Sequence, residues 1–317
     1  MKAAVITHKG AAPVYASFEE PAPVAGHTLV HVSASALSHV TRARASGTHY
    51  SSTGAFPFVA GVDGVGRRAD GSPVYFFAPA APFGGLAERT LVPDSHCVAL
   101  PDALAPHLAA ALAIPGMSSW AALMERARLS RGETVLINGA TGASGRLAVQ
   151  IAKHLGASKV IATGRHQPTL DALHALGADT VISLEQDGRA LSDALEPHFR
   201  AGVDVVLDYL WGESARALLI GAAKGLPDAY PLRFVQIGSI AGSALELPSA
   251  VLRASAITLM GSGIGSVPLT RLLHSVEQVL QAAIPARLQI ATHTAPLADI
   301  ASQWGQVERR ERVVLTM

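Results

Sequence analysis

The chain has 317 residues, of which 49% are hydrophobic and 15% charged, and its formal net charge is +1. This length allows two domains with separate cores, and the near-neutral charge gives no reason to expect nucleic acid or an anionic membrane as a partner. The single cysteine, Cys97, excludes a disulfide framework and a cysteine-rich zinc site. We identify neither a transmembrane helix nor a signal peptide in the sequence, and we expect a cytoplasmic protein.

The N-terminal part of the chain contains short apolar runs separated by proline and glycine, and helical periodicity is almost absent before Ala105. This pattern is typical of a mostly antiparallel β domain. The predicted strands cover residues 2–7, 28–35, 74–78 and 87–92.

From residue 134 onward, apolar runs with the length of strands alternate with segments of helical periodicity. Such alternation predicts a parallel sheet that is covered by helices on both faces. The predicted strands are 134–137, 159–163, 180–184, 203–209, 234–238 and 256–260, and the predicted helices are 169–176, 191–199 and 214–223. Near the C-terminus we expect helices at 269–283 and 297–308 and strands at 287–293 and 312–316.

A glycine-rich turn joins the strand 134–137 to a helical segment, and Ala140, Gly142 and Gly145 match the three small residues of a dinucleotide-binding fingerprint. The first permits a tight turn, the second lets the backbone approach a pyrophosphate, and the third lets the helix pack close to the strand. The N–H groups at the helix start then face the phosphates. The alternative is a structural turn without a ligand. The predicted pyrophosphate contacts are Thr141, Gly142, Ala143, Ser144 and Gly145.

The residues after the second predicted strand indicate which dinucleotide binds. An NAD site usually has an acidic residue here, but the chain has Gly164, Arg165 and His166, and the next carboxylate is Asp171. A guanidinium can make two charge-assisted hydrogen bonds to a 2′-phosphate. The pattern therefore favours NADPH, held by these three residues, over NADH. The alternative is that Arg165 is simply an exposed arginine on a loop.

Phrases along almost the whole chain carry a family resemblance. They read FPFVAGVDGVG at 56–66, FGGLAERTLVP at 83–93, IPGMSSWAAL at 114–123, GETVLINGATGASGRLAVQIAKHLGA at 132–157, VVLDYLWG at 205–212 and RFVQIGS at 233–239. Together they resemble the medium-chain dehydrogenase/reductase superfamily, in the zinc-free quinone oxidoreductase branch that includes zeta-crystallin. The resemblance implies an α/β protein with a GroES-like β-rich catalytic domain over 1–114. It further implies a Rossmann domain with a doubly wound, parallel six-stranded sheet over 115–265, and a C-terminal return to the catalytic domain over 266–317.

The resemblance also implies further cofactor contacts. Ser118 matches a threonine that contacts the cofactor in relatives, and the alternative for this residue is a helix N-cap. Gly238 and Ser239 follow the fifth strand, where the nicotinamide half should lie. Leu210 follows the fourth strand and should line the cofactor cleft. The strand 256–260 resembles the edge strand through which relatives pair, so we expect a homodimer.

Zinc-dependent relatives hold a catalytic metal with a cysteine on one loop and a His-Glu pair after a glycine. Here the loop 37–41 reads LSHVT, without cysteine, and the pair reads Val62-Asp63 after Gly61. A tetrahedral zinc site cannot be assembled without the thiolate and the histidine, so we expect no metal.

The resemblance finally implies a zinc-independent, NADPH-dependent oxidoreductase that transfers hydride to quinones or α,β-unsaturated carbonyl compounds. The chain departs from the family near the expected active site, where the usual Asn, Asp and Arg are Ser38, Thr41 and Ala45. The candidate substrate contacts or proton donors are Ser38, His49 and Tyr50. The alternatives are a non-enzymatic NADPH-binding redox sensor or structural protein, and an alcohol or aldehyde reductase.

Overall fold

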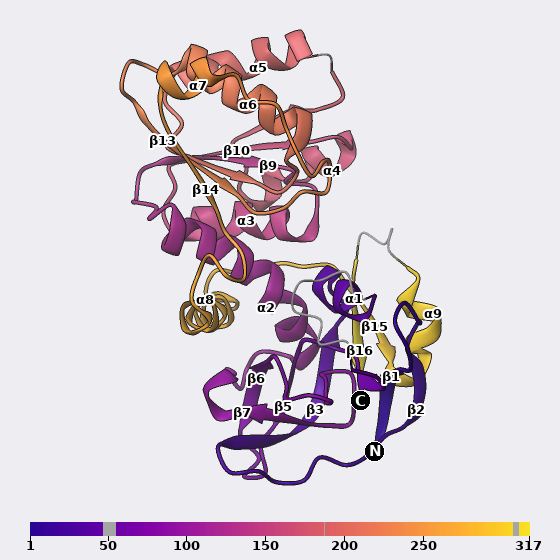
Figure 1. The fold of residues 1–317 in the computed structure, drawn as a ribbon. Helices are drawn as coiled ribbons and strands as arrows, with labels where there is room; N and C mark the ends of the chain where they lie inside the picture. Colours follow the sequence, from indigo (N-terminus) through magenta and orange to yellow (C-terminus); the bar gives the residue numbers. More distant parts are fainter. Residues whose placement is uncertain (47–54, 187, 307–310) are drawn as a thin grey trace. The chain divides into compact units, whose positions relative to one another are not determined.

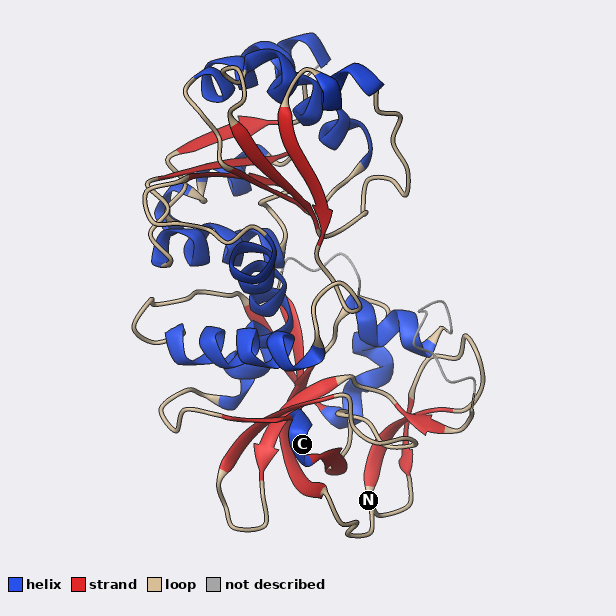
Figure 2. Ribbon diagram, turned by 60° about the vertical axis from the view of Figure 1, so that its left-hand side comes forward, coloured by secondary structure: helices blue, strands red, loops and turns tan. Residues whose placement is uncertain are grey.

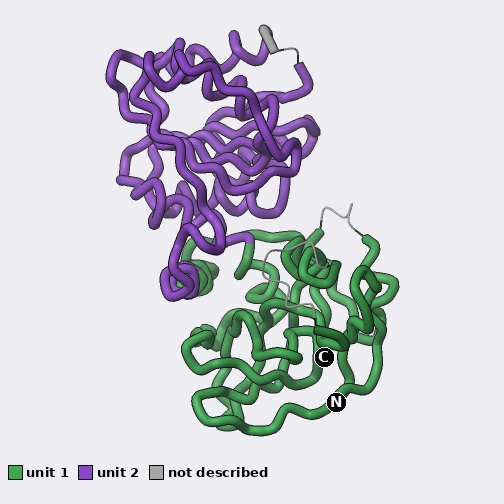
Figure 3. Tube along the Cα trace, viewed as in Figure 1, with its two compact units in different colours: residues 1–114, 276–317 green, residues 115–275 purple. Residues whose placement is uncertain are grey.

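The computed structural model describes residues 1–46, 55–186, 188–306 and 311–317 (Figure 1). The chain divides into two compact units (Figure 3). Unit 1 comprises Met1–Ile114 and Val276–Met317, and unit 2 comprises Pro115–Ser275. The chain leaves unit 1 within helix α2 (Pro106–Ala121) and returns to it within helix α8 (Leu269–Ala282).

Unit 1 is rich in strands, as predicted. In its described part, one sheet has the order β15-β16-β3-β5-β6-β8, with β7 also paired to β3, and a smaller sheet has the order β2-β1-β4. The pairs are antiparallel except for β15 with β16. The strands are β1 (Lys2–Ile6), β2 (Val14–Ser17), β3 (His27–Ala36), β4 (Phe58–Val59), β5 (Asp63–Arg67), β6 (Pro73–Phe77), β7 (Arg89–Pro93), β8 (Cys97–Ala99), β15 (Thr292–Pro296) and β16 (Arg312–Thr316).

Unit 2 contains a parallel six-stranded sheet in the order β11-β10-β9-β12-β13-β14, which confirms the predicted fold class. This is the strand order of the Rossmann fold, and it reverses between β9 and β12. Figure 2 shows helices on both sides of these strands. The strands are β9 (Thr134–Asn138), β10 (Lys159–Gly164), β11 (Thr180–Ser183), β12 (Val205–Asp208), β13 (Pro231–Gln236) and β14 (Ala256–Gly261), and the helices are α3 (Ala143–His154), α4 (Gln167–Asp171), α5 (Gly188–Arg200), α6 (Gly212–Gly225) and α7 (Ser249–Arg253).

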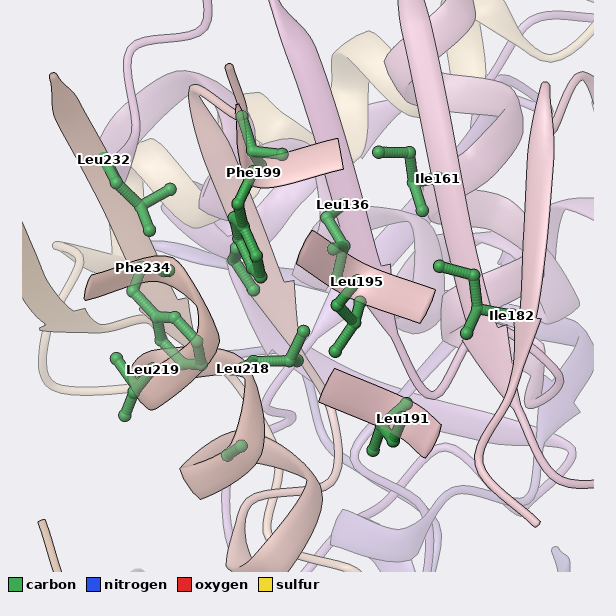
Figure 4. Packing of buried hydrophobic residues seen from close by; sticks show 14 of the residues in the cluster. Leu136, Ile161, Ile182, Leu191, Leu195, Phe199, Leu218, Leu219, Leu232 and Phe234 are labelled. Atoms are coloured by element: carbon green, nitrogen blue, oxygen red, sulfur yellow. The ribbon is translucent and has the colours of Figure 1, made fainter. Parts of the chain in front are cut away.

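The core of unit 2 explains why its strands are continuously apolar. Leu136, Ile161 and Phe234 on the strands meet Phe199 on α5 and Leu218 on α6 (Figure 4). All five side chains are at most 1% exposed. Burying a side chain of this size stabilises the fold by about 1.5–3 kcal/mol, so a strand with helices on both faces gains from apolar residues at every position.

Several elements differ from the sequence-based predictions because they are short or irregular. The prediction did not include β2, β4, β5, β8, α7 or helix α1 (His39–Ala45). The helix expected at 169–176 consists of α4 and a 3₁₀ turn at His174–Leu176, which ends at Gly177 with a φ of +107°. Strand β15 lies later than the expected 287–293, and the helix expected at 297–308 is a 3₁₀ turn at Leu297–Asp299 followed by α9 (Ile300–Trp304). The predicted residues 307 and 308 lie outside the described residues.

One helix bears on the expectation that the chain has no transmembrane helix. Helix α2 continues through a π-helical turn at Ala122–Arg126, and the combined helix is long and apolar enough to cross a membrane. However, 72% of its most apolar window is buried inside the protein. This is the character of a core helix, whose apolar length comes from packing on several sides.

Candidate functional site

Three buried polar side chains meet at the carboxyl edge of the unit 2 sheet. Asn138 ends β9, Thr163 lies near the end of β10 and Asp208 ends β12, and each is 0% exposed. The Nδ2 atom of Asn138 donates to Asp208 Oδ1 at 2.8 Å, and Thr163 Oγ1 donates to Asn138 Oδ1 at 2.7 Å. Because these bonds join three neighbouring strands, they fix the floor on which the following loops lie.

Asp208 also organises the loop after β12. Its carboxylate accepts hydrogen bonds from the backbone N–H groups of Leu210 at 3.0 Å and Trp211 at 3.1 Å. Burial raises the pKa of Asp208, while the N–H donors and Asn138 oppose that rise. Trp211 has a φ of +59°, a conformation that bulky residues rarely adopt, and these bonds help to hold it. This geometry gives Asp208 a structural role at the end of β12.

The glycine turn has the shape required to hold a pyrophosphate. A Cβ atom on Gly145 would lie 2.5 Å from Gly139 O and 2.6 Å from Ala140 Cα, so only glycine lets α3 begin this close to the turn. Gly139 has a φ of +85°. Gly142 is exposed, and a Cβ there would meet nothing within 4 Å. Gly142 is the N-cap of α3 and has no side chain to bond the N–H groups of the first turn, which leaves them available to an anion.

The residues at the end of β10 present a second polar surface. Gly164 packs tightly, since a Cβ there would lie 2.4 Å from Thr141 Cγ2. Arg165 and His166 are exposed. His166 is the N-cap of α4, and its Nδ1 atom lies 3.3 Å from Thr169 N and 2.8 Å from Thr169 Oγ1. The exposed guanidinium of Arg165 thus follows the buried end of β10 and precedes a capped helix.

The remaining predicted cofactor contacts divide into loop residues and helix residues. Leu210 packs over the glycine turn, where its Cγ lies 2.7 Å from the position of a Cβ on Gly139. The Gly238 N–H donates to Asp208 O at 3.1 Å, and the carbonyl of Ser239 accepts from Gly242 N at 3.2 Å. Both therefore follow β13 at the carboxyl edge of the sheet.

Ser118 is not a helix N-cap, because it lies inside α2 and donates to Pro115 O at 2.8 Å. Its neighbour Ser119, which the sequence did not predict as a site residue, is 0% exposed and contacts the first turn of α3. Asn138 and Thr163 were likewise not predicted. The detectable signal for these two was a polar residue at the end of an apolar strand.

In unit 1, Ser38 is buried and its hydroxyl group is already hydrogen-bonded. It is the N-cap of α1, where its Oγ accepts from Thr41 N at 2.9 Å and lies 2.9 Å from Thr41 Oγ1. Next to it, burial lowers the pKa of His39, and the charges of Arg42 and Arg312 act in the same direction. The candidates His49 and Tyr50 lie outside the described residues.

The position of the His-Glu pair of zinc-dependent relatives is buried here. Val62 is 2% exposed and Asp63 is 0% exposed, and Asp63 Oδ2 accepts from Tyr75 OH at 3.2 Å. Burial raises the pKa of Asp63 to about 7, against the opposing charge of Arg312 and the Tyr75 hydrogen bond. Within the described ranges, no three His, Cys, Asp or Glu side chains are grouped so that they could hold a metal ion.

Comparisons with known proteins extend over the whole chain. Residues 143–283 match the family of zinc-binding dehydrogenases. A protein of Emericella nidulans, described as a probable NADPH-dependent quinone reductase, is 29% identical over 99% of both chains. A quinone oxidoreductase of Rattus norvegicus is 32% identical over 60% of this chain and 59% of its own length. The solved quinone oxidoreductase of Thermus thermophilus, also reported in complex with NADPH, has a TM-score of 0.80 and 26% identity and covers 100% of both chains.

Substitutions in the glycine turn should separate folding from ligand binding. We expect Gly145→Ala to lower both the melting temperature and the affinity for NADPH, because its Cβ would clash with the backbone of the turn. Gly142→Ala should keep the wild-type melting temperature and weaken NADPH binding by about tenfold or more, because its methyl group stands where the ligand approaches. Thermal melting and NADPH titration measure the two effects. Equal losses of stability in both variants would contradict this account.

The raised pKa of Asp63 should make stability depend on pH. The pKa is about 7 in the folded protein against an ordinary value of 3.8, so the folded state keeps a proton that the unfolded chain releases. The free energy of unfolding should therefore fall as the pH rises from about 4 to about 7, by about 1.4 kcal/mol for each unit of pKa shift. Asp63→Asn should flatten this slope, as measured by urea unfolding at about pH 5 and about pH 8. A variant with the wild-type slope would refute the assignment.

Proposed function

Because the chain belongs to the medium-chain dehydrogenase/reductase superfamily, in its quinone oxidoreductase branch, we propose that it reduces quinones or α,β-unsaturated carbonyl compounds with NADPH. The observation that carries this proposal is the glycine turn of unit 2, which excludes a side chain at Gly145 and leaves open space at Gly142. The names of the E. nidulans and T. thermophilus proteins support the same cofactor and the same substrate class.

The residues of unit 2 divide the work of holding the cofactor. The first N–H groups of α3, from Ala143 to Gly145, hold the pyrophosphate, because a helix N-terminus attracts negative charge. Arg165 binds the 2′-phosphate with its planar guanidinium, and the neighbouring Gly164 and His166 shape that turn. Ser118, Leu210, Gly238 and Ser239 contact the nicotinamide half. When bound, NADPH supplies the hydride to the substrate.

The protein's task at the substrate is to stabilise negative charge and to exclude water. A conjugated carbonyl or a quinone withdraws electrons itself, so hydride addition needs only hydrogen-bond donors at the oxygen and a proton. We assign this role to Ser38, His49 and Tyr50. Thr41 can donate both its N–H and its O–H to Ser38 Oγ, which leaves the Ser38 proton for the substrate.

We further propose that the reaction needs no metal. The positions that carry zinc ligands in relatives hold Ser38 and Val62, and neither side chain is a zinc ligand of the usual kind. This also disfavours an alcohol or aldehyde reductase, whose chemistry in this superfamily uses a Lewis acid. Dialysis against a chelator should therefore leave activity unchanged.

A cytoplasmic homodimer is the proposed form of the protein, acting on small molecules rather than on nucleic acid or membranes. Strand β14 is at the edge of the six-stranded sheet and pairs with β13. It carries Leu259, which is 40% exposed, and an apolar side chain on an open edge strand favours pairing with a second copy. The net charge of +1 supports the exclusion of nucleic acid.

A panel of acceptors tests the proposed function. The purified protein should oxidise NADPH with at least one quinone or enone, and it should not oxidise it with simple aldehydes or ketones. Absorbance of the reduced nicotinamide at equilibrium and under turnover gives both binding and activity. Tight NADPH binding without turnover of any acceptor would contradict the proposed enzymatic activity and favour a redox sensor or a structural protein.

Arg165 provides the test of cofactor choice. Arg165→Ala should weaken NADPH binding by about tenfold or more and leave NADH binding within about twofold, because only NADPH carries the 2′-phosphate. Arg253→Ala, at another exposed arginine of unit 2, serves as the matched control. An unchanged ratio of the two dissociation constants in Arg165→Ala would show that Arg165 does not read the phosphate.

A further inference from the structure

A pair of hydroxyl groups, from buried Ser119 and half-buried Tyr209, connects three elements of unit 2. Ser119 Oγ lies 2.9 Å from Tyr209 OH, 3.2 Å from Ser144 O and 3.1 Å from Pro115 O. Ser119 lies in α2, Ser144 is in the first turn of α3, and Tyr209 directly follows β12. The pair thus joins the helix before the sheet, the helix at the glycine turn and the loop at the strand reversal.

One arrangement of protons satisfies the contact between the two hydroxyl groups. When Ser119 donates its single proton to Ser144 O or Pro115 O, which can only accept, its Oγ is left as an acceptor. The contact with Tyr209 is then satisfied when the phenol donates to Ser119 Oγ. Burial raises the pKa of Tyr209 to about 12, against opposing hydrogen bonds from Ser119 and Ser118, so the phenol keeps its proton at neutral pH. In this arrangement Tyr209 donates to Ser119, and Ser119 donates to a carbonyl.

Both ends of this chain of hydrogen bonds lie next to groups that hold the cofactor in the proposed function. Ser144 lies between Ala143 and Gly145 in the turn that faces the pyrophosphate. Tyr209 is followed by Leu210, whose side chain packs over Gly139. The Tyr209 N–H also donates to Asn138 O at 3.1 Å, so its backbone is fixed to β9. A shift of the hydroxyl pair would therefore move the first turn of α3 relative to the loop that faces it.

We propose that Ser119 and Tyr209 are positioning residues that set the distance between the first turn of α3 and the loop after β12, and thereby the affinity for NADPH. This inference rests on the proposed function. It assigns a role to two residues that are not among the cofactor or substrate contacts of the proposed function. They act by holding Ser144 and Leu210 in place.

The variants Ser119→Ala and Tyr209→Phe remove one hydroxyl each and leave the surrounding shape nearly unchanged. Each should raise the dissociation constant for NADPH by about three- to tenfold, which corresponds to the loss of one buried hydrogen bond. The double variant should have a dissociation constant within about twofold of the higher of the two single-variant values. Either deletion breaks the same hydrogen bond between Ser119 and Tyr209, so the second deletion adds little. NADPH fluorescence titration measures these constants.

Two matched controls separate positioning from general stability. Ser275 is also a fully buried helix serine, and it donates to Arg271 O at 2.9 Å. Tyr230 donates to Asp204 Oδ1 at 2.7 Å, and its pKa is likewise raised to about 12. Ser275→Ala and Tyr230→Phe delete the same groups away from the glycine turn. Both should lower the melting temperature, while the NADPH dissociation constant stays within about twofold.

Steady-state kinetics provide the second readout. Ser119→Ala and Tyr209→Phe should raise KM for NADPH and keep kcat at saturating NADPH within about threefold, whereas partial unfolding would lower kcat alone. The inference is overturned if the wild type binds NADPH and both variants bind it with the wild-type constant, or if the two deletions are additive. If the wild-type protein bound no NADPH, both the proposed function and this inference about Ser119 and Tyr209 would be overturned.

Discussion

The hydrogen bond between Asn138 and Asp208 joins β9 to β12 at the point where the strand order reverses. A parallel sheet buries the ends of its strands, and polar groups there must find partners or destabilise the fold. Asn138 meets this constraint by bonding to strands on both sides, through Asp208 and Thr163. The loops that follow these strands therefore start from one fixed edge, which determines where the glycine turn and the Trp211 loop begin.

Unit 1 meets a similar constraint differently. Asp63 is buried with one bond from Tyr75, and its Oδ1 has no hydrogen-bond partner among the described residues. Its raised pKa keeps the carboxyl group protonated below about pH 7, with Arg312 as the nearby opposing charge. In unit 2, burial also raises the pKa of Asp208, but N–H donors surround that carboxylate. The two aspartates differ in the number of hydrogen-bond donors that oppose the effect of burial on the pKa of the carboxyl group.

The sequence predicts the unit 2 sheet well because six apolar runs of strand length alternate with helices, and burial on both faces makes that pattern strong. Short elements are missed for the opposite reason: α1 has only seven residues, and its signal is a single N-cap at Ser38. The glycine turn can be predicted from the sequence because sterics allow only glycine at position 145. The role of Ser119 cannot be predicted in this way, because it depends on Ser144 and Tyr209, which lie 25 and 90 residues away in the chain.

The division of the chain has a consequence for synthesis. Unit 2 is one continuous segment, Pro115–Ser275, and every strand of its sheet is made before β16 (Arg312–Thr316). Unit 1 needs segments from both sides of unit 2, because β16 pairs with β3 inside the larger sheet. During synthesis, the N-terminal strands of unit 1 therefore stay incompletely paired until β16 has left the ribosome. Until then the part of β3 that pairs with β16 is an unpaired edge, and Asp63 lacks the nearby charge of Arg312. The emergence of β16 is therefore the event that closes unit 1.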